Sequence, residues 1–190
     1  LAGLPKEVPG ITINRYCSSG LQSIAYGAER IMVGAADTII AGGAESMSLI
    51  PMGGHVIKPN PKLVEHAIGY YMGMGHTAEE VAERFRISRE DQDAFAVQSH
   101  ERAAKAIREG KFDDENVPVE VTERVVGENN KIVEKSKLFI MDEGVREDTN
   151  IEVLSKLKPA FRVNGSVTAG NSSQMSDGAA TVLLMDREKA

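Results

Sequence analysis

The feature that most constrains this chain is the uneven distribution of its charged side chains. Residues 1–50 and 164–190 carry 12 charged side chains in 77 positions, whereas residues 51–163 carry 38 in 113 positions. Charge-poor segments are typical of buried strands and helices, and charge-rich segments are typical of solvated surface. We therefore expect two flanks that form buried α/β structure and a solvated insertion between them, within a length that allows one domain and hardly two.

The composition excludes several classes of protein. With 42% apolar and 26% charged residues, the chain is typical of a soluble globular protein. Its net charge of −6 excludes a general basic surface for nucleic acid, and its one cysteine excludes an internal disulfide and favours a reducing compartment. No apolar run approaches the roughly 20 residues of a membrane span, and the first residues have no signal-peptide pattern.

The first flank is predicted to form a strand, a turn, a helix and a second strand. The β-branched run at 11–13 predicts the first strand, and residues 16–20 predict the turn. Apolar residues at helical spacing over 21–32 predict the helix, and residues 38–41 predict a strand that ends at Gly42. Because a helix joins two buried strands, we expect them to pair in parallel through a right-handed crossover.

The middle of the chain is predicted to be more helical. Residues 77–80 and 88–91 resemble capping boxes, and we expect them to begin two helices that end near Phe85 and Glu109. The remaining predicted elements, in chain order, are a hairpin of extended segments at 117–121, 125–126 and 132–133, a short helix at 151–157, a glycine-rich loop at 170–178 and a strand at 181–185.

Both ends of the chain look cut. The chain does not begin with methionine, and Asp186 is a good helix cap only four residues before the last residue. We therefore expect a fragment of a larger protein. Strands from one part of a larger sheet would leave apolar faces uncovered, so we expect these 190 residues to fold poorly when isolated.

Cys17 is the first candidate for chemistry. Its predicted place between a strand and a helix N-terminus brings the sulfur to the positive end of the helix dipole, which favours the reactive thiolate. The small residues at 18–20 leave room for a substrate. A lone cysteine is also commonly a small buried hydrophobe. From position alone, the two interpretations carry equal weight.

The other candidate groups are less specific. None of the four histidines lies in an HExxH or CxxC-type spacing, so no metal site is indicated. The glycine-rich loops match neither a P-loop nor a dinucleotide-binding turn, which counts against nucleotide hydrolysis and NAD binding. Met72 and Met74 are typical of core packing, and beside a nucleophile they would suit a flexible acyl chain.

Four segments together resemble one enzyme family. Residues 14–22, Asn-Arg-Tyr-Cys-Ser-Ser-Gly-Leu-Gln, resemble the nucleophile motif of the thiolases, and 41–48 resemble the strand end that follows it. Residues 74–100 resemble the start of the family's loop domain, and 170–180 resemble its return segment. The segments stand in the family's order along the whole chain. The nucleophile motif favours the degradative 3-ketoacyl-CoA thiolases, or acetyl-CoA acyltransferases.

The resemblance implies an α/β, thiolase-like fold. In that family two similar halves stack as α-β-α-β-α layers, with an α+β loop domain inserted in the N-terminal half. This chain would hold part of that half: the nucleophile unit at 1–48, the loop domain at 49–167, and the return segment and strand at 168–190. The family's base and second cysteine belong to the C-terminal half, so we expect the 190 residues to be incomplete as a catalyst.

The resemblance also implies an activity and a binding site. The activity is thiolytic cleavage of 3-ketoacyl-CoA, in fatty acid β-oxidation, to acetyl-CoA and a shortened acyl-CoA through an acyl-enzyme on Cys17. Coenzyme A is then a substrate, and neither a tightly bound cofactor nor a metal is expected. The implied substrate contacts are Met74 at the acyl end, Arg146 at the nucleotide end, Leu154 and Phe161 as apolar packing, and Ala169 and Ser173 at the pantetheine arm. Gly73 stands where some relatives have a histidine.

Partners, location and alternatives follow from the same resemblance. We expect the full-length parent to be a homodimer or homotetramer in the cytoplasm, or in an organellar matrix in a eukaryote, with no nucleic-acid partner and no membrane span. A biosynthetic-type acetoacetyl-CoA thiolase and a non-catalytic CoA-binding fragment stay open as alternatives. A cysteine hydrolase has less support, because no His/Asn pattern accompanies Cys17.

Overall fold

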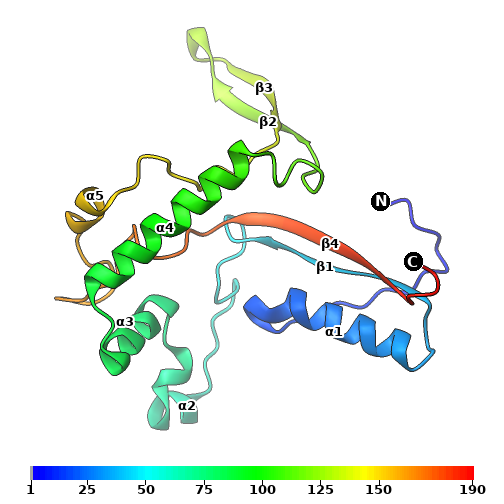
Figure 1. Ribbon diagram of the computed structural model, residues 1–190, viewed down its shortest axis with the longest axis horizontal. Helices are drawn as coiled ribbons and strands as arrows, with labels where there is room; N and C mark the ends of the chain where they lie inside the picture. The colour runs from blue at the N-terminus through cyan, green and yellow to red at the C-terminus, as the bar shows by residue number, and fades with distance from the viewer. Residues whose placement is uncertain (1) are drawn as a thin grey trace. The chain divides into compact units, whose positions relative to one another are not determined.

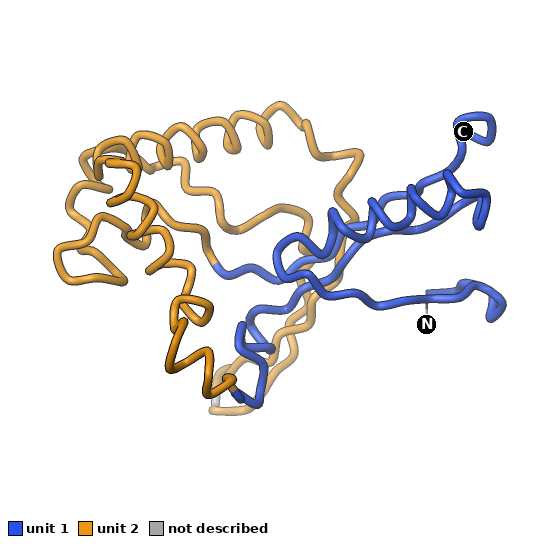
Figure 2. Tube along the Cα trace, turned by 90° about the horizontal axis from the view of Figure 1, so that it is seen from below, with its two compact units in different colours: residues 1–58, 175–190 blue, residues 59–174 orange. Residues whose placement is uncertain are grey.

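The computed structural model describes residues 2–190, which form two compact units (Figure 2). Unit 1 combines the segment that ends at Lys58 with Met175–Ala190, and unit 2 spans Pro59–Gln174. Unit 1 is therefore built from segments at the two ends of the chain, and unit 2 is one continuous segment. The domain boundaries at residues 48 and 167 stay a prediction.

Unit 1 is a two-stranded antiparallel sheet with one helix against it (Figure 1). Strands β1 (Thr38–Ser46) and β4 (Asp177–Met185) pair along their whole length, and helix α1 (Ser19–Met32) packs on them. Gly27 lets the helix approach closely, because a Cβ there would lie 2.7 Å from Cδ1 of Leu184. The predicted helix and the last strand are confirmed.

Three details of unit 1 differ from the sequence-based prediction. Residues 11–13 form no strand, and Ile11 is 88% exposed, so the predicted parallel crossover is wrong. A short β-branched run keeps a strand conformation only beside a partner strand, and within residues 2–190 β1 pairs with β4 alone. β1 also continues past Gly42 to Ser46, because β4 supplies partners along that length. Asp186 caps a single turn, in which its Oδ1 accepts from the Glu188 N–H at 2.8 Å.

Unit 2 contains most of the helices. In chain order they are α2 (Pro61–His66), the 3-10 turn η2 (Ile68–Tyr71), α3 (Met74–Phe85), α4 (Arg89–Arg108) and α5 (Ile151–Ser155). α4 begins as predicted, because the Ser88 hydroxyl accepts from the Asp91 N–H at 3.0 Å. α3 begins three residues before the predicted capping box, and Thr77 lies inside it, where its hydroxyl donates to the Gly73 carbonyl. α5 ends at Ser155, two residues short of the predicted end.

The predicted hairpin is confirmed. β2 (Val119–Val126) pairs with β3 (Ile132–Phe139) in an antiparallel ladder, and the turn η3 (Glu128–Asn130) joins them. Cross-strand ion pairs join Arg124 to Glu134 at 3.1 Å and Lys137 to Glu123 at 2.7 Å. Most of its residues are exposed, as expected for a charged, solvated segment.

The buried residues of unit 2 include three polar side chains. Ala82, Ala104, Leu154 and Val167 are buried, and Glu79, Asp93 and Thr168 are buried with them. Buried polar groups are costly unless they are hydrogen-bonded, so their partners define how this unit is held together. No helix in the described part of the chain is long and apolar enough to cross a membrane.

Candidate active site

Cys17 lies in an exposed turn directly before a helix. The 3-10 turn η1 (Tyr16–Ser18) leads into α1, and the Cys17 thiol is exposed and free of any disulfide. The exposure contradicts the interpretation of this residue as a small buried hydrophobe. The thiol therefore lies at the N-terminal end of a 14-residue helix, where it is accessible to a substrate.

Local side chains hold the shape of this turn. Tyr16 has a positive φ of 49°, a left-handed conformation that is uncommon for a bulky residue. The Tyr16 N–H donates to Oδ1 of Asn14 at 2.9 Å, and the Arg15 N–H donates to Oγ of Ser19 at 2.8 Å. The hydroxyls of Ser18 and Ser19 donate back to the carbonyls of Arg15 and Tyr16. The thiol-bearing turn is therefore fixed by its own Asn and Ser residues.

The six predicted substrate contacts all lie in unit 2, and two of them lie at or against the start of α3. Met74 is the first residue of α3 and is exposed. The ring of Phe161 lies against Gly75, where a Cβ would overlap it, and it meets the His76 ring edge-on with centroids 6.2 Å apart. Met74 and Phe161 thus flank the start of α3 with partly exposed apolar surface.

Ala169 and Ser173 are exposed residues of a turn that begins at the buried Thr168. Thr168 is 0% exposed, its N–H donates to Oδ1 of Asn171 at 2.7 Å, and its carbonyl accepts from the Ser172 hydroxyl at 2.6 Å. Ala169 and Ser173 are both exposed. We call Thr168–Ser173 the return turn.

Leu154 and Arg146 have different surroundings. Leu154 is only 4% exposed and packs against Gly170, where a Cβ would lie 2.5 Å from its Cδ2. Its contact with coenzyme A stays a prediction. Arg146 is exposed, its backbone N–H donates to Nδ1 of His100 at 3.1 Å, and its guanidinium makes no ion pair with any residue from 2 to 190. That side chain can therefore reach an anionic ligand.

Two buried carboxylates beneath the return turn were missed by sequence reasoning. Glu79 is 1% exposed, and it accepts from the backbone N–H groups of Ser166 at 3.0 Å and Val167 at 2.8 Å. Burial by itself raises the pKa of Glu79, but these bonds, the Ser166 hydroxyl and the Arg162 charge together hold it below its ordinary value. Asp93 is 2% exposed. The available signal was that Glu79 lies three residues before the buried Ala82 on one stripe of α3.

A third carboxylate joins the ends of the sheet in unit 1. Asp177 accepts from the Ser48 hydroxyl and, at 2.9 Å, from the Ser48 N–H, which hold the pKa of Asp177 below its ordinary value. Within the described residues, no group of three or more His, Cys, Asp or Glu side chains is arranged to hold a metal ion.

Comparison with known proteins decides the family. The family model of the thiolase N-terminal domain matches residues 1–188. The chain belongs to the thiolase family. It is 68% identical to the 3-ketoacyl-CoA thiolase of Bacillus subtilis over 190 residues, and this alignment covers 100% of the present chain and 49% of the Bacillus protein. It is 45% identical over 207 residues to an acetyl-CoA acetyltransferase of Pseudomonas aeruginosa, covering 100% of this chain and 49% of that protein. The chain spans about half the length of the curated relatives it matches.

Solved structures confirm the thiolase-like α/β fold. The dimeric peroxisomal thiolase of Saccharomyces cerevisiae matches with a TM-score of 0.83 and 37% identity, over 98% of this chain and 46% of that one. The human mitochondrial 3-ketoacyl-CoA thiolase matches with a TM-score of 0.78 and 36% identity, over 98% of this chain and 48% of that one. The resemblance of this chain to the thiolase family is therefore confirmed.

Proposed function

We propose that the protein carrying this chain is an acyltransferase that cleaves 3-ketoacyl-CoA thioesters by thiolysis, with Cys17 as the nucleophile. One observation carries the proposal: in a member of the thiolase family, the chain's one cysteine is an exposed thiol in a fixed turn at the start of a 14-residue helix. Such a position gives a substrate access to a nucleophilic side chain that is held in one place.

The reaction divides into two acyl transfers. The Cys17 thiolate attacks the 3-keto carbonyl carbon, and the bond between C2 and C3 breaks. Its electron pair leaves on the acetyl-CoA enolate, which takes a proton, and the acyl group stays on Cys17 as a thioester. The thiol of a second coenzyme A gives up its proton, attacks that thioester and releases the shortened acyl-CoA and the Cys17 thiolate. The proton donor and most oxyanion donors that this chemistry needs correspond to family motifs that no segment of this chain matches.

The proposed substrate contacts assign parts of coenzyme A to parts of unit 2. Met74 offers apolar surface for the acyl end, Phe161 offers apolar surface that packs on coenzyme A, and the exposed Arg146 suits a phosphate of the nucleotide end. Ala169 and Ser173, on the return turn, would contact the pantetheine arm. Leu154 would supply apolar packing for coenzyme A beside the return turn. Coenzyme A acts as a substrate, with no tightly bound cofactor. The full-length protein is proposed to be a homodimer or homotetramer in the cytoplasm or an organellar matrix.

The decisive experiment looks for the acyl-enzyme in the full-length protein. Incubation with a 3-ketoacyl-CoA in the absence of free coenzyme A should add one acyl mass to the peptide that contains Cys17. Iodoacetamide near pH 7 should alkylate that cysteine quickly, and acyl-CoA should block the alkylation. Cys17→Ser should abolish turnover, while Ser23→Ala, on the same helix, should retain it. Slow alkylation that acyl-CoA does not block, or turnover by Cys17→Ser, would refute the proposal, and binding without an acyl-enzyme would favour a CoA-binding role.

A biosynthetic-type acetoacetyl-CoA thiolase is the second candidate. It is favoured by the relatives named acetyl-CoA acetyltransferase, including a Bacillus anthracis structure with a TM-score of 0.79 and 40% identity, over 99% of this chain and 48% of that one. The higher identity to a protein named 3-ketoacyl-CoA thiolase favours the degradative type. Rates on 3-ketoacyl-CoA substrates of increasing length separate the two, because only the degradative type should act on chains longer than four carbons.

A further inference from the structure

We propose that Arg89, Asp93 and Asn171 form a positioning network that fixes the return turn and so aligns Ala169 and Ser173 for the pantetheine arm. The inference rests on the proposed function, since it names residues that shape the same binding site. None of the three was among the predicted contacts, and none is proposed to touch the substrate.

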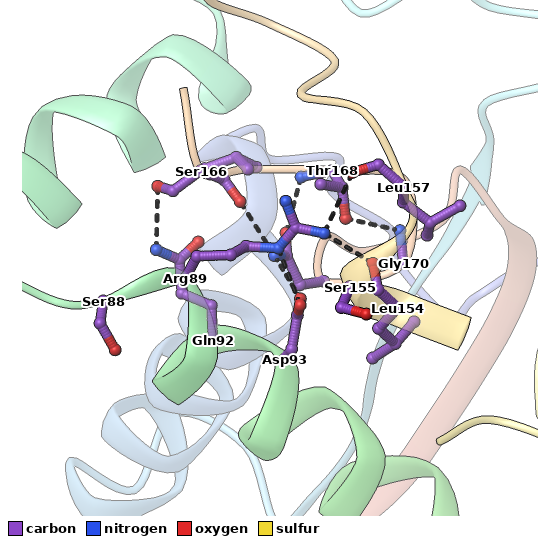
Figure 3. Close-up of polar contacts among 12 residues, drawn as sticks. Ser88, Arg89, Gln92, Asp93, Leu154, Ser155, Leu157, Ser166, Thr168 and Gly170 are labelled. Atoms are coloured by element: carbon purple, nitrogen blue, oxygen red, sulfur yellow. Dashed lines mark hydrogen bonds and ion pairs between the residues drawn. The ribbon is translucent and has the colours of Figure 1, made fainter. Parts of the chain in front are cut away.

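The network begins with Arg89, which ties α4 to α5. Its Nε donates to Oδ2 of Asp93 at 2.8 Å, one helical turn along α4 (Figure 3). Its Nη2 donates to the carbonyls of Leu154 at 2.6 Å and Leu157 at 3.2 Å, near the C-terminal end of α5 (Figure 3). Carbonyls at a helix end have no partner within the helix, and a guanidinium satisfies them well. Arg89 thus holds two elements that are 65 residues apart in sequence.

Asn171 transmits this arrangement to the return turn. Its Nδ2 donates to the second oxygen of Asp93 at 2.9 Å and to the Ser166 carbonyl at 3.1 Å, and its Oδ1 accepts from the Thr168 N–H at 2.7 Å. The Asp93 carboxylate only accepts, so the amide nitrogen must face it and the amide oxygen must face Thr168. The orientation of Asn171, and with it the shape of the turn, is therefore set by Asp93.

The segment leading into the turn is anchored separately. Glu79 of α3 accepts from the N–H groups of Ser166 and Val167. Nε2 of Gln92 donates to the Ser166 hydroxyl at 3.0 Å, as Figure 3 shows. The segment before the turn is thus held by the buried Glu79 and the half-buried Gln92. Such networks resist opening because an unpaired polar group would be left in a dry interior.

The network contains buried residues, whereas the turn surface that it supports is exposed. Asp93 and Thr168 are buried, whereas Ala169 and Ser173 are exposed on the turn. A rigid, preorganised turn binds an extended, flexible ligand more tightly than a mobile one, because less ordering is left to occur on binding. Loss of the network should therefore weaken binding of the pantetheine arm and spare the nucleotide end.

The test compares two asparagine substitutions in the full-length protein. Asn171→Ala removes all three bonds of the amide. Asn60→Ala is the matched control, because Oδ1 of Asn60 accepts from the Lys62 N–H at 2.9 Å at the start of α2, outside the network. Calorimetry then measures the affinity for coenzyme A, for acetyl-pantetheine and for adenosine 3′,5′-bisphosphate, and iodoacetamide measures the reactivity of Cys17.

Asn171→Ala is expected to weaken coenzyme A and acetyl-pantetheine binding by about tenfold or more, the effect of one or two misaligned hydrogen bonds. Affinity for the bisphosphate and the alkylation rate of Cys17 should stay at the wild-type value, and Asn60→Ala should change none of these. Arg89→Lys, which keeps the charge beside Asp93 but loses the contact of Nη2 with the carbonyls of Leu154 and Leu157, should give a smaller loss of the same kind. It also serves as the test if Asn171→Ala fails to fold.

Three results would overturn the inference: equal losses in Asn171→Ala and Asn60→Ala, an equal loss for the bisphosphate and the pantetheine compound, or no loss at all. A wild-type protein that binds coenzyme A but forms no acyl-enzyme would refute the thiolysis proposal alone, because the binding comparison would still report on the network. A wild-type protein that binds neither coenzyme A nor acetyl-pantetheine would refute both.

Discussion

Removal of the Glu79 carboxylate is expected to release the segment that begins at Ser166. In Glu79→Ala, the backbone N–H groups of Ser166 and Val167 lose an acceptor that now lies 2.8–3.0 Å away. An unpaired buried donor costs about 1–3 kcal/mol, so the two together should cost about 2–6 kcal/mol of unfolding free energy. That range is a large part of the stability of an ordinary domain.

Glu79→Gln separates the role of the charge from that of the hydrogen bonds. The amide oxygen can replace Oε1, which accepts from both N–H groups, and the amide nitrogen can donate to the Ser166 hydroxyl that Oε2 now contacts at 3.2 Å. The bond from the Ser166 N–H to Oε2, at 3.0 Å, is lost because the amide nitrogen cannot accept it, and the remaining bonds lose their charge-assisted part, so the expected cost is about 1–3 kcal/mol. The order of stability should be wild type, then Glu79→Gln, then Glu79→Ala.

The pH dependence of this effect has a definite sign. Burial raises the pKa of Glu79, but its hydrogen bonds and Arg162 together lower it below 4.5 in the folded state. The carboxylate therefore stabilises the fold fully above the unfolded pKa, and its contribution is lost as the pH falls through the folded pKa. The free-energy difference between wild type and Glu79→Gln should be constant near neutral pH and should shrink below pH 4.5.

Hydrogen exchange and urea unfolding of the full-length protein measure both effects. The amides of Ser166 and Val167 should exchange far faster in Glu79→Ala than in wild type, while the amides of the hairpin at 119–139 should change only if the whole protein is destabilised. Unchanged exchange at residues 166 and 167, or a Glu79→Gln difference that grows on acidification, would refute the reasoning.

Three further outcomes test the packing and capping of both units. Gly170→Ala should cost about 1–3 kcal/mol by overpacking, because its Cβ would lie 2.5 Å from a methyl of Leu154, and thermal melts would measure the loss; an unchanged melting temperature would contradict the close packing of α5. Ser88→Ala should cost about 1 kcal/mol through loss of the α4 cap, seen in urea unfolding, and Ser88→Asp should restore most of it. Asp177→Asn should weaken the link to Ser48 near neutral pH but not at a pH below the lowered pKa of Asp177, so the difference in melting temperature should vanish on acidification.

Much of the local structure could be predicted because its causes lie close together in sequence. The Ser88 cap is completed three residues later, and the helical spacing of apolar residues between 21 and 32 marks the face of α1 that packs on the sheet. The turn around Cys17 is likewise closed by Asn14, Ser18 and Ser19. The turn and the helix start that follows it could therefore be predicted from neighbouring residues alone.

The errors have a common physical origin in partners that are distant along the chain. The run at 11–13 has the β-branched residues of a strand, but no segment within residues 2–190 pairs with it as a strand. The extension of β1 to Ser46 depends on pairing with Asp177, far along the chain. Local preference predicted each extended segment, and pairing decided which of them became a strand and in which direction.

By itself, the sequence determined the family, the place of Cys17 at a helix start, the α4 cap and the hairpin, because each follows from motifs or spacings within a few residues. Only the tertiary structure decided that Glu79 and Asp93 are buried and that they hold the return turn. A carboxylate can be buried only where enough donors surround it, and the donors of Glu79 lie 87 and 88 residues away. That condition depends on how α3, α4 and the turn pack, which no local pattern records.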